Sequence, residues 1–283
     1  MADPRDKLNR REFLKQSAWV AGGLVVSAVG LPFLIESHAI EPKVGELLRP
    51  PGSIEEDEFL YACIKCGLCV QICPVHAIKL ADVDEGLGYA TPYINAREQA
   101  CDFSCDSIQC AETCPTAALN FKIFRNASTK KAEELQPLIE KGELDPMESW
   151  RLQIHAMKEA TRIGVAKVND QTCLAYQGKG FKGTPRGKDF KGVLRYEKIS
   201  ERKPQPVREQ YFDREICDLC VIHCPIGETA IKMVEKELPD GRKTKVPEVE
   251  RGCTGCGTCE MICPTEPASI VVLPQKTYEE VYS

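Results

Sequence analysis

Residues 63–74 read CIKCGLCVQICP, which is the spacing C-x2-C-x2-C-x3-C-P. Three thiolates at positions i, i+3 and i+6 of a tight loop can face three irons of one iron–sulfur cubane, while the fourth cysteine, followed by a proline, points toward a second cluster. This stretch therefore predicts a partner run of cysteines elsewhere in the chain.

Three further cysteine runs follow. Residues 101–115, CDFSCDSIQCAETCP, have a looser spacing with the same x3-C-P ending, and residues 253–264, CTGCGTCEMICP, repeat the strict spacing. Residues 217–225, CDLCVIHCP, keep only the last three cysteines of the pattern. The last cysteine of one run and the first of the next are 28 positions apart in the first pair of runs and 29 in the second. Nearly equal gaps are typical of a duplicated unit.

The third run lacks its first cysteine, because Arg214 stands three positions before Cys217. Cys173 is the only cysteine outside the four runs. Four cubanes need sixteen thiolates, and the chain has sixteen cysteines if Cys173 is counted. We therefore expect Cys173 to supply the missing ligand across an inserted loop.

Crossed binding, in which the fourth cysteine of each run serves the neighbouring cluster, predicts four ligand sets. They are Cys63, Cys66, Cys69 and Cys114 for the first cluster, Cys101, Cys105, Cys110 and Cys73 for the second, Cys173, Cys217, Cys220 and Cys263 for the third, and Cys253, Cys256, Cys259 and Cys224 for the fourth. An alternative arrangement pairs the first run with the last and the two middle runs with each other. The matching gaps favour sequential pairs.

Disulfides and zinc account less well for so many cysteines. Sixteen in 283 residues is below the density of a disulfide-built secreted scaffold, and the spacing is too regular for one. Zinc also takes four thiolates, but zinc sites seldom use triplets with a trailing x3-C-P. The net charge of -5 gives no general electrostatic case for nucleic acid. We expect an α+β fold of two tandem bacterial-type ferredoxin-like units that hold four 4Fe-4S clusters.

The N-terminus has the pattern of an export signal. Arg10 and Arg11 precede an almost uncharged stretch at residues 17–35, which glycines, serines and a proline dilute. We expect a twin-arginine signal over residues 1–39 with cleavage after Ala39, and an uncleaved membrane anchor is the alternative. The twin-arginine route carries folded proteins, so clusters can be inserted before the thiols meet an oxidising compartment.

The remaining chain divides by composition. We expect one ferredoxin unit over residues 40–125, a helical linker over 126–165, and a second unit over 166–283 with an insertion at 178–212. Residues 179–208 carry ten Lys and Arg against three acids. This basic loop is interpreted either as a solvated insertion or as a docking surface for an acidic partner or anionic lipid.

Local patterns give finer expectations. Each C-P pair is expected to be followed by a short helical turn and then a strand-like stretch. The linker helix is expected to be interrupted at Pro137 and Pro146, and to pack one face, with Trp150, Ile154, Met157 and Thr161 at helical spacing, on a ferredoxin unit. His76 and His223 lie beside predicted ligands, and we interpret them as ordinary loop residues rather than as residues that tune a cluster.

Four features together resemble the NapG/MauM ferredoxin-type proteins of periplasmic nitrate reduction and methylamine utilisation. They are RPPG at 49–52, ATPYINAR at 90–97, the split third run, and CTGCGTCEMIC at 253–263. The second run and the long gap after Cys173 depart from the family pattern. The resemblance implies a periplasmic protein that takes electrons from a membrane iron–sulfur quinol dehydrogenase subunit and passes them toward a c-type cytochrome or a molybdenum reductase.

The sequence shows no nucleophile with its base, no dinucleotide fingerprint and no phosphate loop. We therefore expect an electron-transfer component with no substrate site of its own and no nucleic-acid partner. Two alternatives remain: the small subunit of an exported molybdopterin oxidoreductase, and a metal-binding assembly factor.

Overall fold

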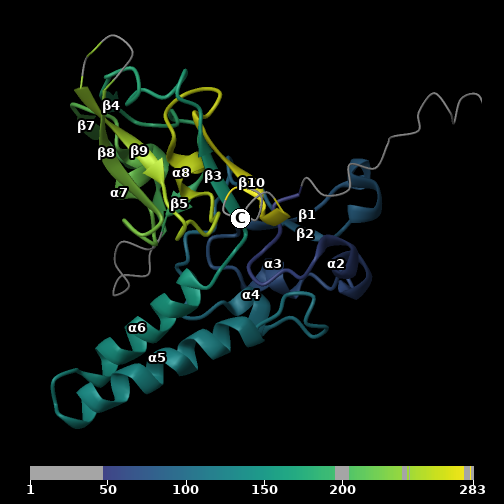
Figure 1. Ribbon diagram of the computed structural model, residues 1–283. Helices are drawn as coiled ribbons and strands as arrows, with labels where there is room; N and C mark the ends of the chain where they lie inside the picture. Colours follow the sequence, from purple (N-terminus) through teal and green to yellow (C-terminus); the bar gives the residue numbers. More distant parts are fainter. Residues whose placement is uncertain (1–46, 195–203, 238–240, 242, 277–280, 282–283) are drawn as a thin grey trace, which may run out of the picture. The chain divides into compact units, whose positions relative to one another are not determined.

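The described structure contains short helices, two long helices and five two-stranded antiparallel sheets, joined by irregular loops (Figure 1). The computed structural model describes residues 47–194, 204–237, 241, 243–276 and 281. The predicted export signal lies outside them. Among the residues that are described, no helix combines the length and the apolar character needed to cross a membrane.

The first half contains the first two cysteine runs. Its elements are α2 (Glu56–Ala62), α3 (Leu68–Ile72), β1 (Ile78–Leu80), η1 (Val83–Gly88), β2 (Pro92–Ile94) and α4 (Gln109–Glu112). Strands β1 and β2 are antiparallel, with Ile78 opposite Ile94. Both isoleucines are buried, so this short sheet turns one face to the core.

The second half contains the last two runs and repeats the same plan. Its elements are β3 (Gly164–Val168), β4 (Phe181–Gly183), β5 (Val193–Leu194), β6 (Gln205–Pro206), η2 (Val207–Glu209), β7 (Phe212–Arg214), α7 (Leu219–Ile222), β8 (Ile231–Glu237), β9 (Lys243–Val249), α8 (Thr258–Ile262) and β10 (Ile270–Pro274). Strand β10 pairs with β3, and β8 pairs with β9. The gap within each pair of runs is thus filled by an antiparallel strand pair, β1–β2 in one half and β8–β9 in the other.

The expected helical turn after each C-P pair is wrong in position. The short helices α3, α4, α7 and α8 all end before the proline of their runs. A turn follows the proline, and strands β1, β8 and β10 come next in three of the four runs. After the second run, only an isolated bridge from Leu119 to Ser53 forms. The physical reason is ligand spacing, because one helical turn fits between the third and fourth cysteines.

Two long helices connect the halves and lie side by side in Figure 1: α5 (Lys122–Glu140) and α6 (Pro146–Glu159). The expected break at Pro137 does not occur, since this proline lies within the last turn of α5. Pro146 does begin a helix: it is the first residue of α6, and the Asp145 carboxylate caps that end by accepting from the backbone N–H of Met147 at 2.8 Å. Of the expected apolar face, Ile154 is buried and Trp150 is 40% exposed.

The described part of the basic insertion folds back onto the first half. Strand β5 begins at Val193, whose N–H and C=O both bond the side-chain amide of Gln99 at 2.9 Å. Leu194 and Val207 are buried with residues of α8 in a second small core. The insertion is therefore more than a solvated loop, because it contributes its own buried side chains. Residues 195–203, within the basic stretch, lie outside the described residues.

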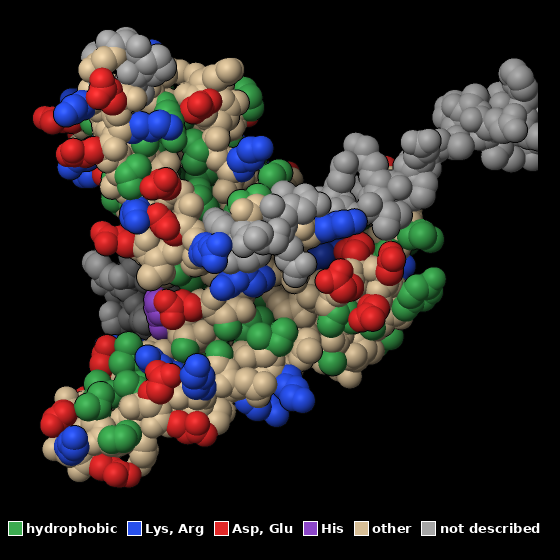
Figure 2. All heavy atoms as spheres, in the orientation of Figure 1, with side chains coloured by type: hydrophobic (Ala, Val, Ile, Leu, Met, Phe, Trp, Pro, Cys, Tyr) green, Lys and Arg blue, Asp and Glu red, His purple; other side chains and the backbone are tan. Residues whose placement is uncertain are grey.

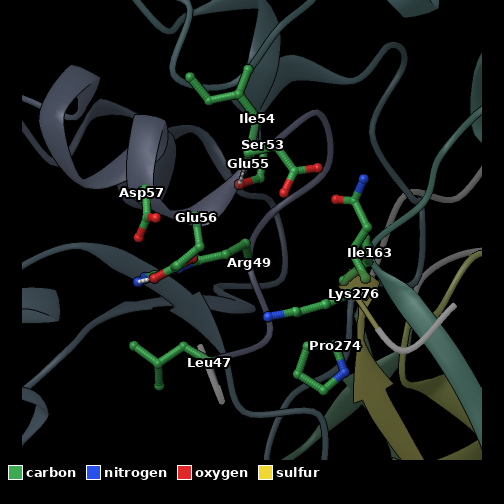
Figure 3. Close-up of a pocket in the computed structure, with 11 residues that line it drawn as sticks. Leu47, Arg49, Ser53, Ile54, Glu55, Glu56, Asp57, Ile163, Pro274 and Lys276 are labelled. Atoms are coloured by element: carbon green, nitrogen blue, oxygen red, sulfur yellow. Dashed lines mark hydrogen bonds and ion pairs between the residues drawn. The ribbon is translucent and has the colours of Figure 1, made fainter. Parts of the chain in front are cut away.

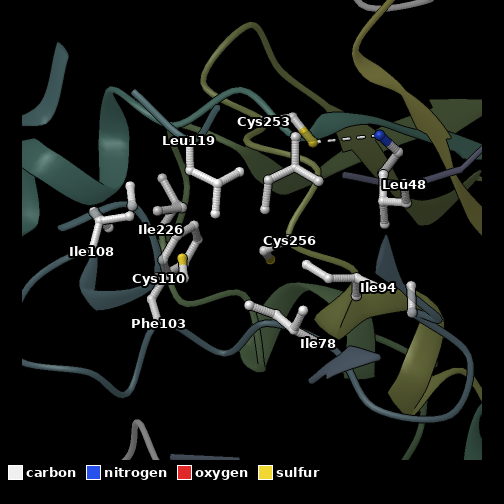
Figure 4. Close-up of a cluster of buried hydrophobic side chains, with 14 of the residues drawn as sticks. Leu48, Ile78, Ile94, Phe103, Ile108, Cys110, Leu119, Ile226, Cys253 and Cys256 are labelled. Carbon is white, nitrogen blue, oxygen red and sulfur yellow. Dashed lines mark hydrogen bonds between the residues drawn. The ribbon is translucent and has the colours of Figure 1, made fainter. Parts of the chain in front are cut away.

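The main core is shared by the two halves rather than divided between them. Phe103, Ile108 and Leu119 of the first half belong to the same buried cluster as Ile226 and Cys253 of the second (Figure 4). The described residues accordingly belong to one compact unit. Each half therefore contributes buried side chains to a core that the other half also lines.

Candidate metal centres

The structure brings all sixteen cysteines into four groups, which we number as sites. Site 1 contains Cys63, Cys66, Cys69 and Cys114, site 2 Cys73, Cys101, Cys105 and Cys110, site 3 Cys173, Cys217, Cys220 and Cys263, and site 4 Cys224, Cys253, Cys256 and Cys259. The cysteines of sites 1, 3 and 4 line pockets that hold about 370, 360 and 340 Å³ of space, part of it open to solvent. These groups join the first run with the second and the third with the fourth. Cys173 lies with the third run and Cys263, as a displaced first ligand would.

Burial makes these thiols poor acids. It raises the pKa of Cys256 to about 12 and that of Cys217 to about 11. Burial also raises the pKa of Cys101 and Cys110 in site 2 well above the usual value, and the neighbouring Cys105 and Cys73 raise it further. A cation bound among these thiols would displace their protons, so metal binding and proton release are coupled.

Backbone N–H groups point at the sulfur atoms of the cysteines that precede proline. The N–H of Ala77 donates to Cys73 Sγ at 3.3 Å, and the N–H of Ser269 donates to Cys263 Sγ at 3.3 Å. Such bonds favour the thiolate form and are among the features that set the reduction potential of an iron–sulfur cluster.

The loops adopt strained backbone conformations at matching positions. Lys65 and Phe103 lie two residues after the first cysteine of their runs and have φ of 58° and 52°. His76 and Ala117 lie three residues after the last cysteine of their runs and have φ of 54° and 56°. Residues other than glycine rarely adopt positive φ, and such strain persists where the surroundings impose it. The loops are thus bent around the cysteines rather than following the easiest backbone path.

The donor sets fit a multi-iron cluster better than one ion. Within the described part of the chain, no three His, Cys, Asp or Glu side chains are arranged to hold a single metal ion. A tetrahedral zinc ion would need four sulfurs about 2.3 Å from one point. Four thiols on separate walls of one cavity are instead the donor set of a 4Fe-4S cluster.

Comparison with known proteins agrees with this chemistry. A family model described as a 4Fe-4S dicluster domain matches residues 62–137 and again residues 215–266. The methylamine utilization ferredoxin-type protein MauM of Methylorubrum extorquens is 31% identical over 98% of this chain and 93% of its own length. The ferredoxin-type protein NapG of Escherichia coli is 32% identical over 94% of this chain and 85% of its own length. The chain belongs to the NapG/MauM family of ferredoxin-type proteins.

A third relative of this NapG/MauM-family chain is MauM of Paracoccus denitrificans, which is 30% identical over 96% of the chain and 90% of its own length. No solved structure matches the chain. The family is therefore shown by sequence over nearly the whole length, with two dicluster iron–sulfur domains.

Two stretches that carry the NapG/MauM resemblance meet in the fold. Arg49 of RPPG is buried, and its guanidinium forms a two-pronged ion pair with Glu56 (Figure 3). It also donates to Thr91 Oγ1 at 2.8 Å and to the Pro92 carbonyl at 2.9 Å, both in ATPYINAR. Its Cζ lies 4.8 Å from the centroid of the Phe59 ring, and Phe59 and Pro92 line the site 1 pocket. Arg49 therefore braces the wall of site 1.

The other end of ATPYINAR joins the two halves. Arg97 donates to the carbonyls of Glu260 and Thr265 at 2.6 Å and to that of Cys263 at 2.9 Å. It also pairs with the Glu266 carboxylate at 2.9 Å. Sequence reasoning noticed the stretch as a family feature but did not predict this contact. The only sequence signal for this contact is a single arginine in an otherwise uncharged stretch. Such an arginine is too common for a role to be assigned to it from sequence alone.

Two further residues of the chain have surroundings that differ from those expected from the sequence. Arg186 of the basic insertion donates to the carbonyls of Arg97 and Met261, so its charge serves the internal structure. His223 is buried against Phe212, with ring centroids 5.2 Å apart, and is not an ordinary exposed loop residue. Burial lowers the pKa of His223 to about 4. His76 is exposed, as expected of a loop residue.

Proposed function

We propose that this chain is an electron-transfer protein that binds four 4Fe-4S clusters, one at each site. The observation that carries the proposal is the gathering of all sixteen cysteines into four groups of four with no thiol left over. The clusters, when bound, supply one-electron carriers whose potentials depend on hydrogen bonds to sulfur and on solvent exposure. The chain binds them, bends its loops around them and leaves only one of their sixteen ligands, Cys66, exposed to water.

Contacts between the sites support a relay in the order 1, 2, 4, 3. Cys69 of site 1 is near enough to Cys110 of site 2 to raise its pKa. The backbone N–H of Cys101 in site 2 donates to the carbonyl of Cys256 in site 4 at 3.0 Å. Cys220 of site 3 is likewise near enough to Cys259 of site 4 to raise its pKa. The sites at the ends of this series are 1 and 3.

Counting iron tests the proposal. Protein purified without oxygen should contain about 16 iron and 16 sulfide per chain. The electron paramagnetic resonance spectrum of the dithionite-reduced protein should show interacting reduced clusters, because the sites are neighbours. Fewer than about three clusters per chain would contradict a four-cluster relay, and zinc in place of iron would point to a structural or assembly role.

The resemblance to the NapG/MauM family supports a proposal for the partners and the location of the protein. We propose that the protein is exported folded to the periplasm, receives electrons from a membrane iron–sulfur subunit that oxidises quinol, and delivers them toward a c-type cytochrome or a reductase. Co-purification from membranes tests this. A quinol-oxidising membrane subunit in the complex supports the proposal, and a large molybdenum subunit would make the chain a subunit of an exported molybdopterin oxidoreductase. The double change R10K/R11K should leave the unprocessed protein in the cytoplasm if the export route is the twin-arginine one.

A further inference from the structure

Site 1 is the only site with a ligand cysteine at the surface. All sixteen cysteines lie within the described residues, and Cys66 alone among them is exposed. The cysteine at the equivalent position of the fourth run, Cys256, is buried. A redox partner can therefore approach a cluster ligand of site 1 without any opening of the structure.

The side chains around Cys66 are large and apolar, although water surrounds them. Tyr61 is 92% exposed, Ile64 62% and Leu68 40%. The positions that match Ile64 and Leu68 in the fourth run are Thr254 and Thr258, and both are fully buried. The exposed run thus has large apolar residues where the buried run has small polar ones. Folding of this chain alone would favour the opposite arrangement, with the apolar side chains buried and the polar ones in water. Exposed apolar groups of this kind mark a surface that another molecule covers.

Acidic side chains border this apolar surface. Helix α2 begins with Glu55 at its N-cap, and its first turn contains Asp57 and Glu58. Asp57 and Glu58 precede Tyr61 by four and three residues, so they share its helix face. Figure 2 shows acidic side chains gathered over α2 with hydrophobic side chains beside them. Lys65 is held over the ring of Tyr89, 5.8 Å from its centroid.

We propose that Cys66, its apolar neighbours Tyr61, Ile64 and Leu68, and the acidic first turn of α2 form the docking surface for a redox protein. That partner carries its cofactor edge in an apolar patch ringed by lysine and arginine. The inference rests on the four-cluster function proposed above. It makes site 1, at one end of the proposed relay, the place where electrons pass between this chain and its partner.

The size and the charge of the surface both suit a brief encounter. Electron-transfer complexes bury little area, and opposite charges speed their formation while the small apolar contact lets them separate. Glu55, Asp57 and Glu58 are all exposed, so their carboxylates can steer a basic partner without the cost of burying a charge. A lipid surface with anionic head groups would be repelled by the same carboxylates.

The test uses the iron-loaded full chain and a basic c-type cytochrome from mitochondria as the probe. One electron passes from the dithionite-reduced protein, freed of excess dithionite, to ferric haem, which becomes ferrous; no bond forms and no proton moves. In stopped-flow mixing, the wild-type rate constant should fall as salt is raised. The triple variant E55K/D57K/E58K should lower that constant about tenfold or more at low salt and remove the salt dependence.

A matched control variant reverses the charge of three acidic side chains far from site 1. The variant E133K/E140K/E143K has the same change of net charge on the connecting helices and their loop, and it should react like wild type. The change Tyr61→Ser, at a side chain with almost no internal contact, should slow the reaction several-fold without altering its salt dependence.

A second measurement does not depend on electron transfer. Carbodiimide joins a carboxylate directly to a lysine amine in contact with it, so cross-links to the cytochrome should map to Asp57 or Glu58 by mass spectrometry. Equal slowing by both triple variants, or cross-links scattered over the surface, would overturn the docking surface while leaving an intact iron count and the proposed function standing. A low iron count would instead contradict the function itself.

Two other outcomes would also overturn the proposal. If the protein dimerises in sedimentation and Tyr61→Ser abolishes the dimer, a second copy covers the surface. If wild type but not Tyr61→Ser sediments with vesicles of anionic phospholipid, a membrane covers it.

Discussion

The first and fourth cysteine runs have the same spacing and opposite surroundings. Both bend at equivalent residues: Gly67 and Gly257 have φ of 74° and 90°, and each precedes a five-residue helix. Around Gly67 nothing lies within 4 Å of where a Cβ would stand, whereas a Cβ on Gly257 would lie 2.5 Å from Ala96 Cβ. The spacing of the cysteines therefore determines the loop, while the residues between them determine whether the loop is at the surface or in the core.

The same contrast between an exposed and a packed run holds at the residue that precedes the second cysteine of each run. Lys65 in the first run adopts φ of 58° and is exposed, and its counterpart Gly255 has φ of 71° and packs on the backbone of Gly164. A lysine is possible in the first run because solvent accepts its side chain, although its backbone is strained. In the fourth run only glycine fits. The difference teaches that one ligand spacing is compatible with two surroundings: the first run is exposed at the surface, and the fourth closes the shared core.

The largest expected effect concerns the first ligand position of each run. We propose that Cys63 and Cys253 occupy it in the strict runs, and that Cys173 occupies it in the third run. Cys173→Ala should remove one cluster and leave three, so the iron count should fall from about 16 to about 12 per chain. Iron analysis with electron paramagnetic resonance measures this. A full iron count in the variant would show that Cys173 is not a ligand.

Gly255→Ala tests the packed run directly. An added Cβ would stand 2.3–2.5 Å from three backbone atoms of Gly164, none of which can rotate away. We expect a loss of more than about 4 kcal/mol in the free energy of unfolding, or no folded protein. Chemical denaturation of the iron-loaded protein measures it. The matched change Lys65→Ala should cost less than about 0.5 kcal/mol, and equal effects at the two positions would remove the contrast between the runs.

The residue before the last cysteine gives a pH-dependent test. This position is exposed Ile72 in the first run, buried Ile262 in the fourth and buried His223 in the third. The pKa of His223 falls from 6.5 to about 4 through burial, so the unfolded chain binds the proton more readily than the folded one. Stability contributed by neutral His223 is complete above pH 6.5 and is lost as the pH falls toward 4, by up to about 3 kcal/mol.

His223→Leu should therefore flatten the decline of stability between pH 6.5 and 4, measured by denaturant unfolding at several pH values. The same slope in wild type and in His223→Leu would mean that other groups, such as the thiols, account for all of the acid sensitivity.

The smallest expected effect is at Gly67. Gly67→Ala meets no atom within 4 Å, so only the backbone conformation resists it, at a cost of about 1 kcal/mol. Gly257→Ala should cost more, since it must also displace Ala96. Thermal unfolding of the two variants side by side measures the difference. A larger loss at Gly67 than at Gly257 would contradict the surface position of the first run.

Cysteine spacing is enough to write down the four sites, and the structure gathers the same residues, although their binding of iron stays a prediction until iron is counted. Spacing works here because thiolate geometry leaves few solutions for a C-x2-C-x2-C loop. The membership of Cys173 comes from counting alone, and no local pattern around it would find it.

Further features could not be read from the sequence, for identifiable physical reasons. Sequence patterns put the short helices after the prolines, because strand and helix signals are ambiguous over five residues. They also put a helix end at Pro137, but a proline in the last turn costs little, since few helical bonds remain to be broken there. The shared core and the contacts of Arg97 depend on residues more than 150 positions apart, which no local pattern encodes.

The bond from Cys101 to the Cys256 carbonyl and the clamp made by Arg97 also impose an order in time. About 150 residues separate Cys114 from Cys263, and a ribosome needs roughly 7–30 s to add them. During that interval the first half has every ligand of sites 1 and 2 but lacks the neighbour that covers it. Synthesis of the last cysteine run therefore completes the contacts that join the two halves, and the first half reaches its final packing only after that run has left the ribosome.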